Sequence, residues 1–233
     1  MVVIWIFSWY YICMTITWYG HSCFRIEAHS TSSGQAKEAI SILIDPFSKE
    51  IGLRPPKIKD DLVLVTHHHF DHDNVSEVNP EALVIDGPGE YEKHGIQVRG
   101  ISSFHDKTNG KERGLNTIYL IKAEDMTLCH LGDLGQDKLD DGQVEEIGDV
   151  DILMVPVGGT YTIDAKEAAG IVGQIEPKIV IPMHYKIKDL KVEVSGPDKF
   201  LKEIGLSPEK VDKFKIAKKN LPAEEMKLVM FEN

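Results

Sequence analysis

The sequence predicts an α/β fold in which two β-sheets are sandwiched between helices. Short β-branched and aromatic runs bounded by Gly, Pro, Asp or Asn dominate the first half of the chain. In the second half, strand-like runs alternate with segments whose apolar residues recur at helical spacing. No linker, low-complexity tract or fixed-period repeat divides the 233 residues, so we expect one domain.

The strands expected in the first half are short and end at turn-forming residues. They cover residues 15–26, 39–45, 62–66, 82–86, 96–104, 116–122 and 126–132. The polar stretch 29–39 is typical of a loose hairpin connection between the first two strands.

Three helices are expected in the second half, over residues 137–148, 164–177 and 196–205. Asp164 suits the N-cap of the second helix, and Gly205 suits the end of the third. The near-continuous apolar runs 150–159 and 178–185 lie between these segments and are typical of strands covered on both faces. This alternation predicts helical layers outside the two sheets.

The first thirteen residues are apolar and aromatic and carry no charge. The run is too short to cross a bilayer, and it lacks the basic start and the cleavage site of a signal peptide. We therefore expect residues 1–13 to be a leader outside the domain, which would cover residues 14–233. A membrane-surface anchor is the alternative, although basic flanking residues are missing.

Charge and cysteine content restrict the partners and the compartment. The net charge of -11 disfavours broad nucleic-acid binding, whereas bound cations would leave an anionic small substrate possible. The three cysteines fall in apolar runs without a Cys-x-x-Cys pair, as expected for a cytoplasmic protein with small thiols in its core. We expect no membrane span.

The strongest functional signal is THHHFDHDN, residues 66–74, with four histidines and two aspartates. In an extended segment His67 and His69 point to one side and His68 points away. Asp71 and His72 follow where the chain must turn. The spacing thus offers two imidazoles to one metal ion and a carboxylate with an imidazole to a second. An accidental polar loop is the alternative interpretation.

Three expected strands run directly into potential ligands. The run 62–66 precedes His67, the run 126–132 precedes Asp133, and the apolar run from residue 178 precedes His184. Rigid strand ends are common places for binding and catalytic groups.

His-x-His-x-Asp-His resembles the hallmark of the metallo-β-lactamase superfamily, and the resemblance runs from about Met14 to the C-terminus. Four further segments match its motifs in order: LIDPF, SSFHD, HLGDLG and PMHY. The resemblance implies a four-layer αββα sandwich and two divalent metal ions, zinc first, with manganese or iron as alternatives. It implies that one ion is held by His67, His69 and His105, the second by Asp71, His72 and His184, and that Asp133 bridges them.

Within the superfamily, WYGHSCF, GPGEYE and PVGGTYTID are most similar to the L-ascorbate-6-phosphate lactonase-like branch and its uncharacterised hydrolase relatives. The chain lacks the His-x-x-Gly-His pattern of glyoxalase-type thioesterases. It also lacks the arm of tRNA 3′-processing relatives, the extra domain of mRNA-cleaving relatives and any flavodoxin or rubredoxin module. No substrate can therefore be taken from a named relative.

Each candidate outside the central motif has a structural alternative. His105 and His184 are isolated histidines, and Asp133 could be a turn residue. Asp45 could accept a proton from a ligand imidazole or form the turn before Pro46.

Other candidates lie further from the central motif. His21 lines a pocket or is a buried strand histidine, and His130 is expected in the core. Glu90 is a pocket group or part of an ordinary loop. Three lysines after the last motif either attract an anion or are solvated: Lys186, Lys188 and Lys191.

The resemblance implies attack by a metal-bound hydroxide on a carbonyl or phosphoryl centre, with Asp71 orienting the nucleophile. We therefore expect a dinuclear metal-dependent hydrolase of a lactone, an ester or a phosphorylated compound. A metal-dependent phosphodiesterase or nuclease and a non-catalytic metal-binding module are the alternatives. A serine hydrolase is not indicated, because no Gly-x-Ser-x-Gly elbow occurs.

Overall fold

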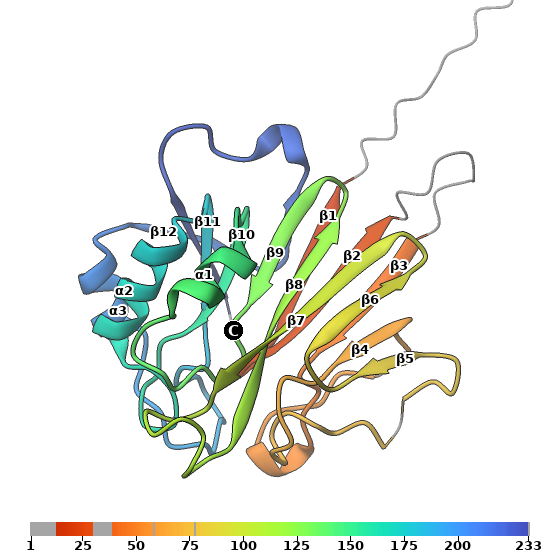
Figure 1. Ribbon diagram of the computed structural model, residues 1–233, viewed down its shortest axis with the longest axis horizontal. Coiled ribbons are helices and arrows are strands. Elements are labelled where there is room, and N and C mark those ends of the chain that lie inside the picture. The colour runs from red at the N-terminus through yellow and green to blue at the C-terminus, as the bar shows by residue number, and fades with distance from the viewer. Residues whose placement is uncertain (1–12, 30–38, 58, 77, 233) are drawn as a thin grey trace, which may run out of the picture.

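Two mixed β-sheets face each other in the computed structural model, which describes residues 13–29, 39–57, 59–76 and 78–232 (Figure 1). The six-stranded sheet has the order β13-β1-β2-β3-β4-β5, and the eight-stranded sheet has the order β12-β14-β11-β10-β9-β8-β7-β6. The strands of the first sheet are β1 Met14–Gly20, β2 Cys23–His29, β3 Ala39–Ile44, β4 Leu62–Leu64, β5 Leu83–Ile85 and β13 Phe214–Ile216. Those of the second are β6 Gly89–Lys93, β7 Ile96–Phe104, β8 Leu115–Ala123, β9 Met126–His130, β10 Ile152–Pro156, β11 Ile179–Met183, β12 Pro208–Val211 and β14 Lys227–Phe231.

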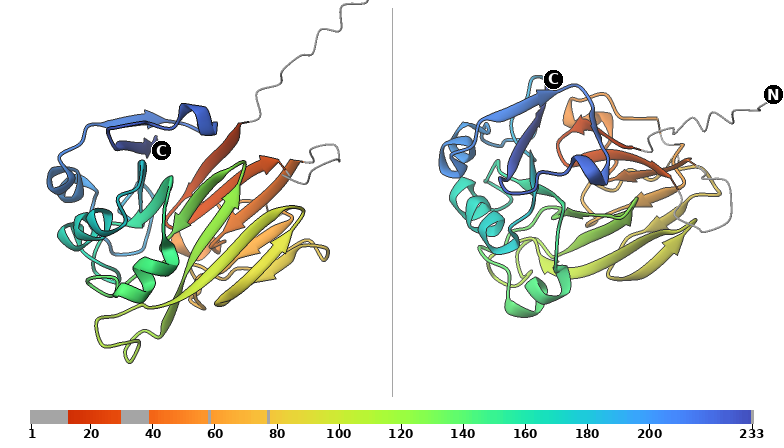
Figure 2. Two further views of the ribbon diagram at one scale, coloured as in Figure 1. Left: turned by 45° about the horizontal axis from the view of Figure 1, so that its top comes forward. Right: turned by 90° about the horizontal axis from the view of Figure 1, so that it is seen from above.

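Three helices, α1 Asp141–Ile147, α2 Ala165–Ile175 and α3 Asp198–Ile204, lie together outside the eight-stranded sheet (Figures 1 and 2). The side chain of Asp164 caps α2 by accepting hydrogen bonds from the backbone N–H groups of the first turn. The helix α3 ends at Gly205 in the left-handed conformation. These helices and the two sheets confirm the predicted α/β fold.

Loops and a short 3₁₀ helix, η1 Lys49–Ile51, cover the outer face of the six-stranded sheet in the described part of the chain. Leu43 and Val63 from that face pack in a small core with Phe47, Ile51 and Leu190. The main core lies between the sheets, where β1 alternates between buried and partly exposed residues. A second 3₁₀ helix, η2, spans Lys218–Asn220.

The predicted strand 15–26 is wrong in one respect, because the chain reverses within it. The strands β1 and β2 are antiparallel and Gly20 pairs with Cys23 across a two-residue turn. Gly20 and His21 have φ values of 96° and 56°, so both lie in the left-handed region that interrupts a strand. The turn places His21 at the tip of the hairpin. The short strands β6 and β12–β14 are not predicted from the sequence.

Residues 1–12 and 30–38 lie outside the described residues, so the expected leader and the expected hairpin connection are not described here. The cysteines Cys13, Cys23 and Cys129 are free, and the last two are buried. Among the described residues, no helix is both long enough and apolar enough to span a membrane.

Five strands end next to polar residues that meet at one end of the sandwich. The strands β3 and β4 lead to Asp45 and His67, and the strands β7, β9 and β11 lead to His105, Asp133 and His184. Both sheets therefore contribute to a single cluster, which includes the three strand-end candidates His67, Asp133 and His184.

Candidate metal centre

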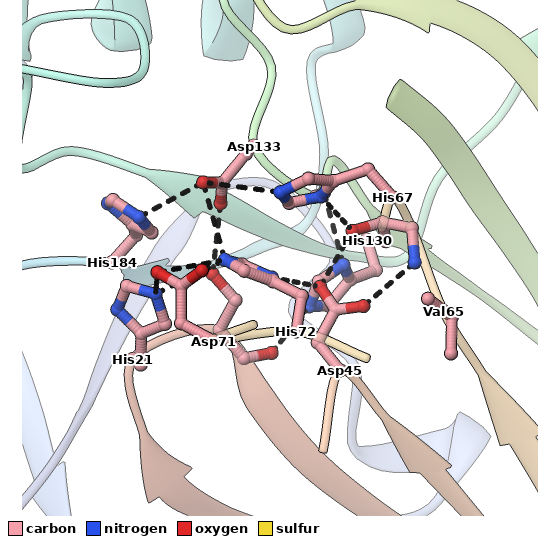
Figure 3. A network of polar contacts seen from close by, with 12 residues as sticks. His21, Asp45, Val65, His67, Asp71, His72, His130, Asp133 and His184 are labelled. Carbon is pink, nitrogen blue, oxygen red and sulfur yellow. Dashed lines mark hydrogen bonds and ion pairs between the residues drawn. The ribbon is translucent and has the colours of Figure 1, made fainter. Parts of the chain in front are cut away.

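A buried carboxylate lies at the centre of a histidine cluster (Figure 3). Asp133 Oδ2 is 3.1 Å from Nε2 of His184 and 3.3 Å from Nε2 of His72. The Nε2 atoms of His105 and His67 lie 3.6 and 4.0 Å from the same oxygen. All five residues are at most 5% exposed. Four imidazoles, two from the segment after β4 and one each from the ends of β7 and β11, thus converge on one carboxylate oxygen.

The backbone around Asp133 fixes this carboxylate. The Asp133 N–H donates to Asn116 Oδ1 at 2.9 Å, and Ser22 Oγ donates to Asp133 Oδ1 at 3.4 Å. Gly132 has a φ of 56°, and a Cβ atom there would lie 2.3 Å from Asn116 Oδ1. Only glycine fits at this position, so the HLGDLG motif is explained by the close approach of Asn116.

The side chains of His67, His69 and His105 form a second grouping, in which the three candidate ligand atoms lie within 4.8 Å of one another. His68 points away: its side chain is 65% exposed and lies 3.7 Å from the carboxylate of Asp86. The alternation expected along residues 67–69 is therefore present although these residues form no strand.

Asp45 holds the ring of His72 in place. Its Oδ2 lies 3.0 Å from His72 Nδ1 and accepts a hydrogen bond from Thr66 Oγ1 at 2.8 Å, while its Oδ1 accepts one from the Thr66 N–H at 2.8 Å. Asp45 also has a φ of 47° before Pro46, so it is both a turn residue and the partner of an imidazole. When Nδ1 donates to Asp45, the Nε2 lone pair of His72 faces Asp133.

His21 belongs to the cluster as well. Its Nε2 is 3.1 Å from Asp71 Oδ2 and 3.1 Å from His72 Nε2, and its side chain is fully buried (Figure 3). Its carbonyl oxygen accepts hydrogen bonds of 3.0 Å from the His184 N–H and from Trp18 Nε1. Of the two alternatives left by the sequence, the structure shows a buried histidine, although it lies in a turn and contacts the cluster rather than lining the cavity.

Burial and neighbouring charges set the protonation of the cluster. Burial lowers the pKa of His67 and His105, and burial reinforced by His184 lowers the pKa of His21 to about 4. Burial would raise the pKa of Asp133, but its histidine partners outweigh this and hold the pKa well below its usual range. These three imidazoles are therefore neutral and lie near an ionised carboxylate, the forms that bind metal ions.

His72 differs from these three imidazoles. Burial lowers its pKa, but the carboxylates of Asp133 and Asp45 outweigh burial and raise the pKa well above its usual value. A position where a buried proton is stabilised by two carboxylates also stabilises a metal cation.

The cluster fits divalent metal ions by two observations. Four buried ring nitrogens of the cluster have no hydrogen-bond partner: His21 Nδ1, His67 Nε2, His105 Nδ1 and His184 Nδ1. Of these, His67 Nε2 faces Asp133 at 4.0 Å, and an orphaned atom in such a position is rare in a protein interior. Donor atoms about 2.0–2.2 Å from one ion lie roughly 3.0–3.5 Å apart. The spacings of 3.1 and 3.3 Å between Asp133 and two histidines are of this size.

The cluster opens into a cavity of about 450 Å³ whose lining includes Phe70, Arg113, Tyr161 and Lys191. The Arg113 guanidinium lies 4.9 Å from the centre of the Tyr161 ring. The carboxylate of Asp106 organises the Arg113 loop, because it accepts hydrogen bonds from four backbone N–H groups, including that of Arg113 at 2.8 Å. Tyr161 lies in the PVGGTYTID segment that carries the branch resemblance, but no sequence signal identified Tyr161 or Arg113 as part of the site.

Other candidates lie outside this centre. Glu90 is exposed and forms an ion pair of 2.7 Å with Arg99, away from the cavity of the cluster. Lys186 donates to the carbonyl oxygen of Leu190, so among the expected lysines only Lys191 lines this cavity. His130 contacts the carbonyl oxygen of Ser22 at 2.9 Å and is buried against Phe24 in the core as expected.

The two sheets and the histidine cluster define a protein of the metallo-β-lactamase class. Residues 15–184 match the family described as Beta-lactamase superfamily domain. A UPF0173 metal-dependent hydrolase of Pyrococcus horikoshii is 31% identical, over 90% of this chain and 97% of that protein. Another from Thermoplasma acidophilum is 30% identical, over 76% and 85%. The chain belongs to the UPF0173 family of metal-dependent hydrolases within the metallo-β-lactamase superfamily.

Solved structures agree with this assignment. A crystal structure from Thermotoga maritima, described as a candidate Zn-dependent hydrolase of the metallo-β-lactamase superfamily, is 38% identical with a TM-score of 0.74. The match covers 94% of this chain and 98% of that one. The metallo hydrolase Igni18 of Ignicoccus hospitalis shares the fold at 20% identity and a TM-score of 0.55.

Proposed function

We propose that this chain binds two divalent metal ions and hydrolyses a small anionic substrate. Zinc is the first candidate for both ions. The observation that carries the proposal is the convergence of four imidazoles on Asp133 Oδ2, at 3.1 to 4.0 Å. Three or four ligands complete one site, so seven candidates are enough for two. The residues that would hold the ions are His67, His69 and His105 for the first, Asp71, His72 and His184 for the second, and Asp133 between them.

Divalent ions lower the pKa of a water ligand and polarise a carbonyl or phosphoryl oxygen. Asp71 is the residue of this chain placed to orient the attacking water, because it lines the cavity and its side chain is 13% exposed. Burial would raise the pKa of Asp71, but the hydrogen bond from His21 and the nearby His72 hold it below its usual range. Asp71 therefore stays a hydrogen-bond acceptor.

Two cationic side chains line the cavity, Arg113 and Lys191, and they support an anionic substrate. Arg113 stacks on Tyr161 and, among the described residues, forms no ion pair with a carboxylate. Its guanidinium is thus held in place with its donors free for a carboxylate or a phosphate. Glu50 and Glu193 also line the cavity and oppose a long polyanion. This mixture favours a small substrate with one anionic group over a nucleic acid.

The similarity to the L-ascorbate-6-phosphate lactonase-like branch supports a phosphorylated lactone as the first substrate to test. A cavity of about 450 Å³ is in the size range of small-molecule sites. Simple esters that carry a carboxylate or a phosphate would be recognised through the same anionic group, and they form the second group of substrates to test.

The test is a hydrolysis panel with the zinc-loaded and manganese-loaded protein. The panel contains phosphorylated lactones, carboxylate-bearing esters, neutral esters and phosphodiesters. We expect turnover of anionic lactones or esters, and we expect Asp71→Asn to abolish most of it. Turnover of phosphodiesters alone would overturn the lactone or ester assignment, and turnover of nothing in either metal form would overturn the proposed reaction.

A matched pair of variants tests the anionic part of the proposal. Arg113→Ala is expected to raise KM for anionic substrates roughly 10- to 100-fold, because a charged hydrogen bond contributes about 1.5–3 kcal/mol. Arg99→Ala removes an exposed arginine that pairs with Glu90 outside the cavity and is expected to leave KM unchanged. Equal KM values in both variants would contradict the role of Arg113.

A further inference from the structure

His21 occupies a position that the metallo-β-lactamase ligand set, as carried over from the sequence, leaves without a role. Its ring lies among three groups proposed for the second metal ion. The Nε2 atom is 3.1 Å from both Asp71 Oδ2 and His72 Nε2, and the ring centre is 4.2 Å from that of His184. The candidate ligand atoms of His21, His72 and His184 all lie within 4.8 Å of one another.

The backbone at His21 is held in an uncommon conformation. Its φ of 56° lies in the left-handed region, which few residues other than glycine adopt, although histidine does so more often than most. Hydrogen bonds from the His184 N–H and Trp18 Nε1 to the His21 carbonyl oxygen, both 3.0 Å, hold the turn. These bonds connect the hairpin tip directly to the strand end that carries His184.

The close contact between two Nε2 atoms needs a physical reason. In the neutral form of His72 whose Nδ1 donates to Asp45, Nε2 is an unprotonated acceptor, and this is the form that binds a metal ion. A proton on His21 Nε2 can point to only one of its two neighbours at 3.1 Å. A shared cation would satisfy His21, His72 and Asp71 together, and 3.1 Å is close to the roughly 3.0–3.5 Å expected between ligands of one ion.

We propose that His21 is an additional nitrogen ligand of the second metal site, beside Asp71, His72 and His184. The inference rests on the proposed function, because it presupposes that this site binds an ion. It adds a third imidazole to the site and places a ligand on the β1–β2 turn, outside the His-x-His-x-Asp-His segment. The competing role for His21 is that of a hydrogen-bond donor that only positions Asp71.

Two variants separate a ligand from a positioning donor. His21→Gln keeps an N–H group that can donate to Asp71 but removes the imidazole lone pair, and glutamine is a poor ligand. His21→Asn tolerates the positive φ and is too short to reach the ion. His130→Gln is the control, because His130 is also buried but its ring nitrogens contact backbone groups, the carbonyl oxygen of Ser22 and the N–H of Gly132, which a glutamine amide can also bind. Thermal melting checks that each variant is folded.

The readouts are metal content after dialysis, zinc affinity by chelator competition, and the absorption spectrum of the cobalt-loaded protein. We expect both His21 variants to bind the second ion at least about 10- to 100-fold more weakly than the wild type and to change the cobalt spectrum. His130→Gln should retain two ions. Wild-type affinity and spectrum in His21→Gln would overturn the inference and leave the proposed function standing. A wild-type protein with no second ion would overturn both.

Discussion

Exchanging Asp45 for Asn tests how the protein prepares His72 to bind a metal ion. Asp45 is 1% exposed and accepts hydrogen bonds from the Thr66 N–H, from Thr66 Oγ1 and from His72 Nδ1. Asparagine has nearly the same shape and tolerates the φ of 47°. Its single oxygen must face the Thr66 N–H, because a backbone donor cannot become an acceptor. The amide N–H groups then point towards His72 Nδ1.

The consequence is a change of tautomer. His72 Nδ1 has to accept a hydrogen bond, so the proton moves to Nε2, the atom 3.3 Å from Asp133 Oδ2. That proton occupies the position proposed for the second ion. Partners of ligand histidines typically contribute about 10- to 100-fold in metal affinity, or roughly 1.4–2.7 kcal/mol. The lost charged hydrogen bonds should also lower the free energy of unfolding by about 1.5–3 kcal/mol.

Chelator competition measures the affinity, and chemical denaturation measures the stability. Asp60→Asn is the control, because Asp60 is also 1% exposed and accepts hydrogen bonds of 2.7 and 2.8 Å from Arg25, outside the histidine cluster. Both variants are expected to lose stability, but only Asp45→Asn should lose metal affinity. Unchanged affinity in Asp45→Asn would refute the tautomer reasoning.

Three further predictions follow from single contacts. His69→Ala should lose metal affinity at least about tenfold. His68→Ala should not, because the His68 side chain is 65% exposed and points away from the cluster. Equal losses of metal in the two variants, measured by elemental analysis, would contradict this alternation. Asp106→Ala should raise KM roughly 10- to 100-fold at constant metal content, because the loop that it organises loses its hydrogen bonds; an unchanged KM would argue against the loop. Burial would raise the pKa of Asp151, but hydrogen bonds from Lys178 and Lys218 outweigh burial and leave the pKa lowered. The Tm of the wild type should therefore exceed that of Asp151→Asn fully above about pH 4, and the difference should shrink as the pH falls further.

The sequence predicted the parts of the fold that depend on local patterns. The apolar run before His184 forms a parallel strand buried on both faces, and the segment after Asp164 forms a capped helix. The turn at His21 was not predicted, because the apolar and aromatic residues on either side continue a strand pattern and only the backbone shows the reversal. The C-terminal strands are short and partly exposed, so they carry no clear periodicity.

The candidate site was predicted to a similar extent. Residues that follow strands, such as Asp133 and His184, could be identified because a strand end fixes the position of the next side chain. Arg113 could not, since its place beside Tyr161 depends on hydrogen bonds between a loop and Asp106. Position in an irregular loop is set by such contacts, and they leave no periodic trace in the sequence. His21 remained undecided for the same reason.

The most direct test of the account is anomalous diffraction at the zinc absorption edge from crystals of the zinc-loaded protein. The account predicts two anomalous peaks on either side of Asp133. One should lie among His67, His69 and His105, and the other should lie beside Asp71, His72 and His184. A single peak, or peaks away from Asp133, would contradict the central claim that this cluster is a dinuclear metal site.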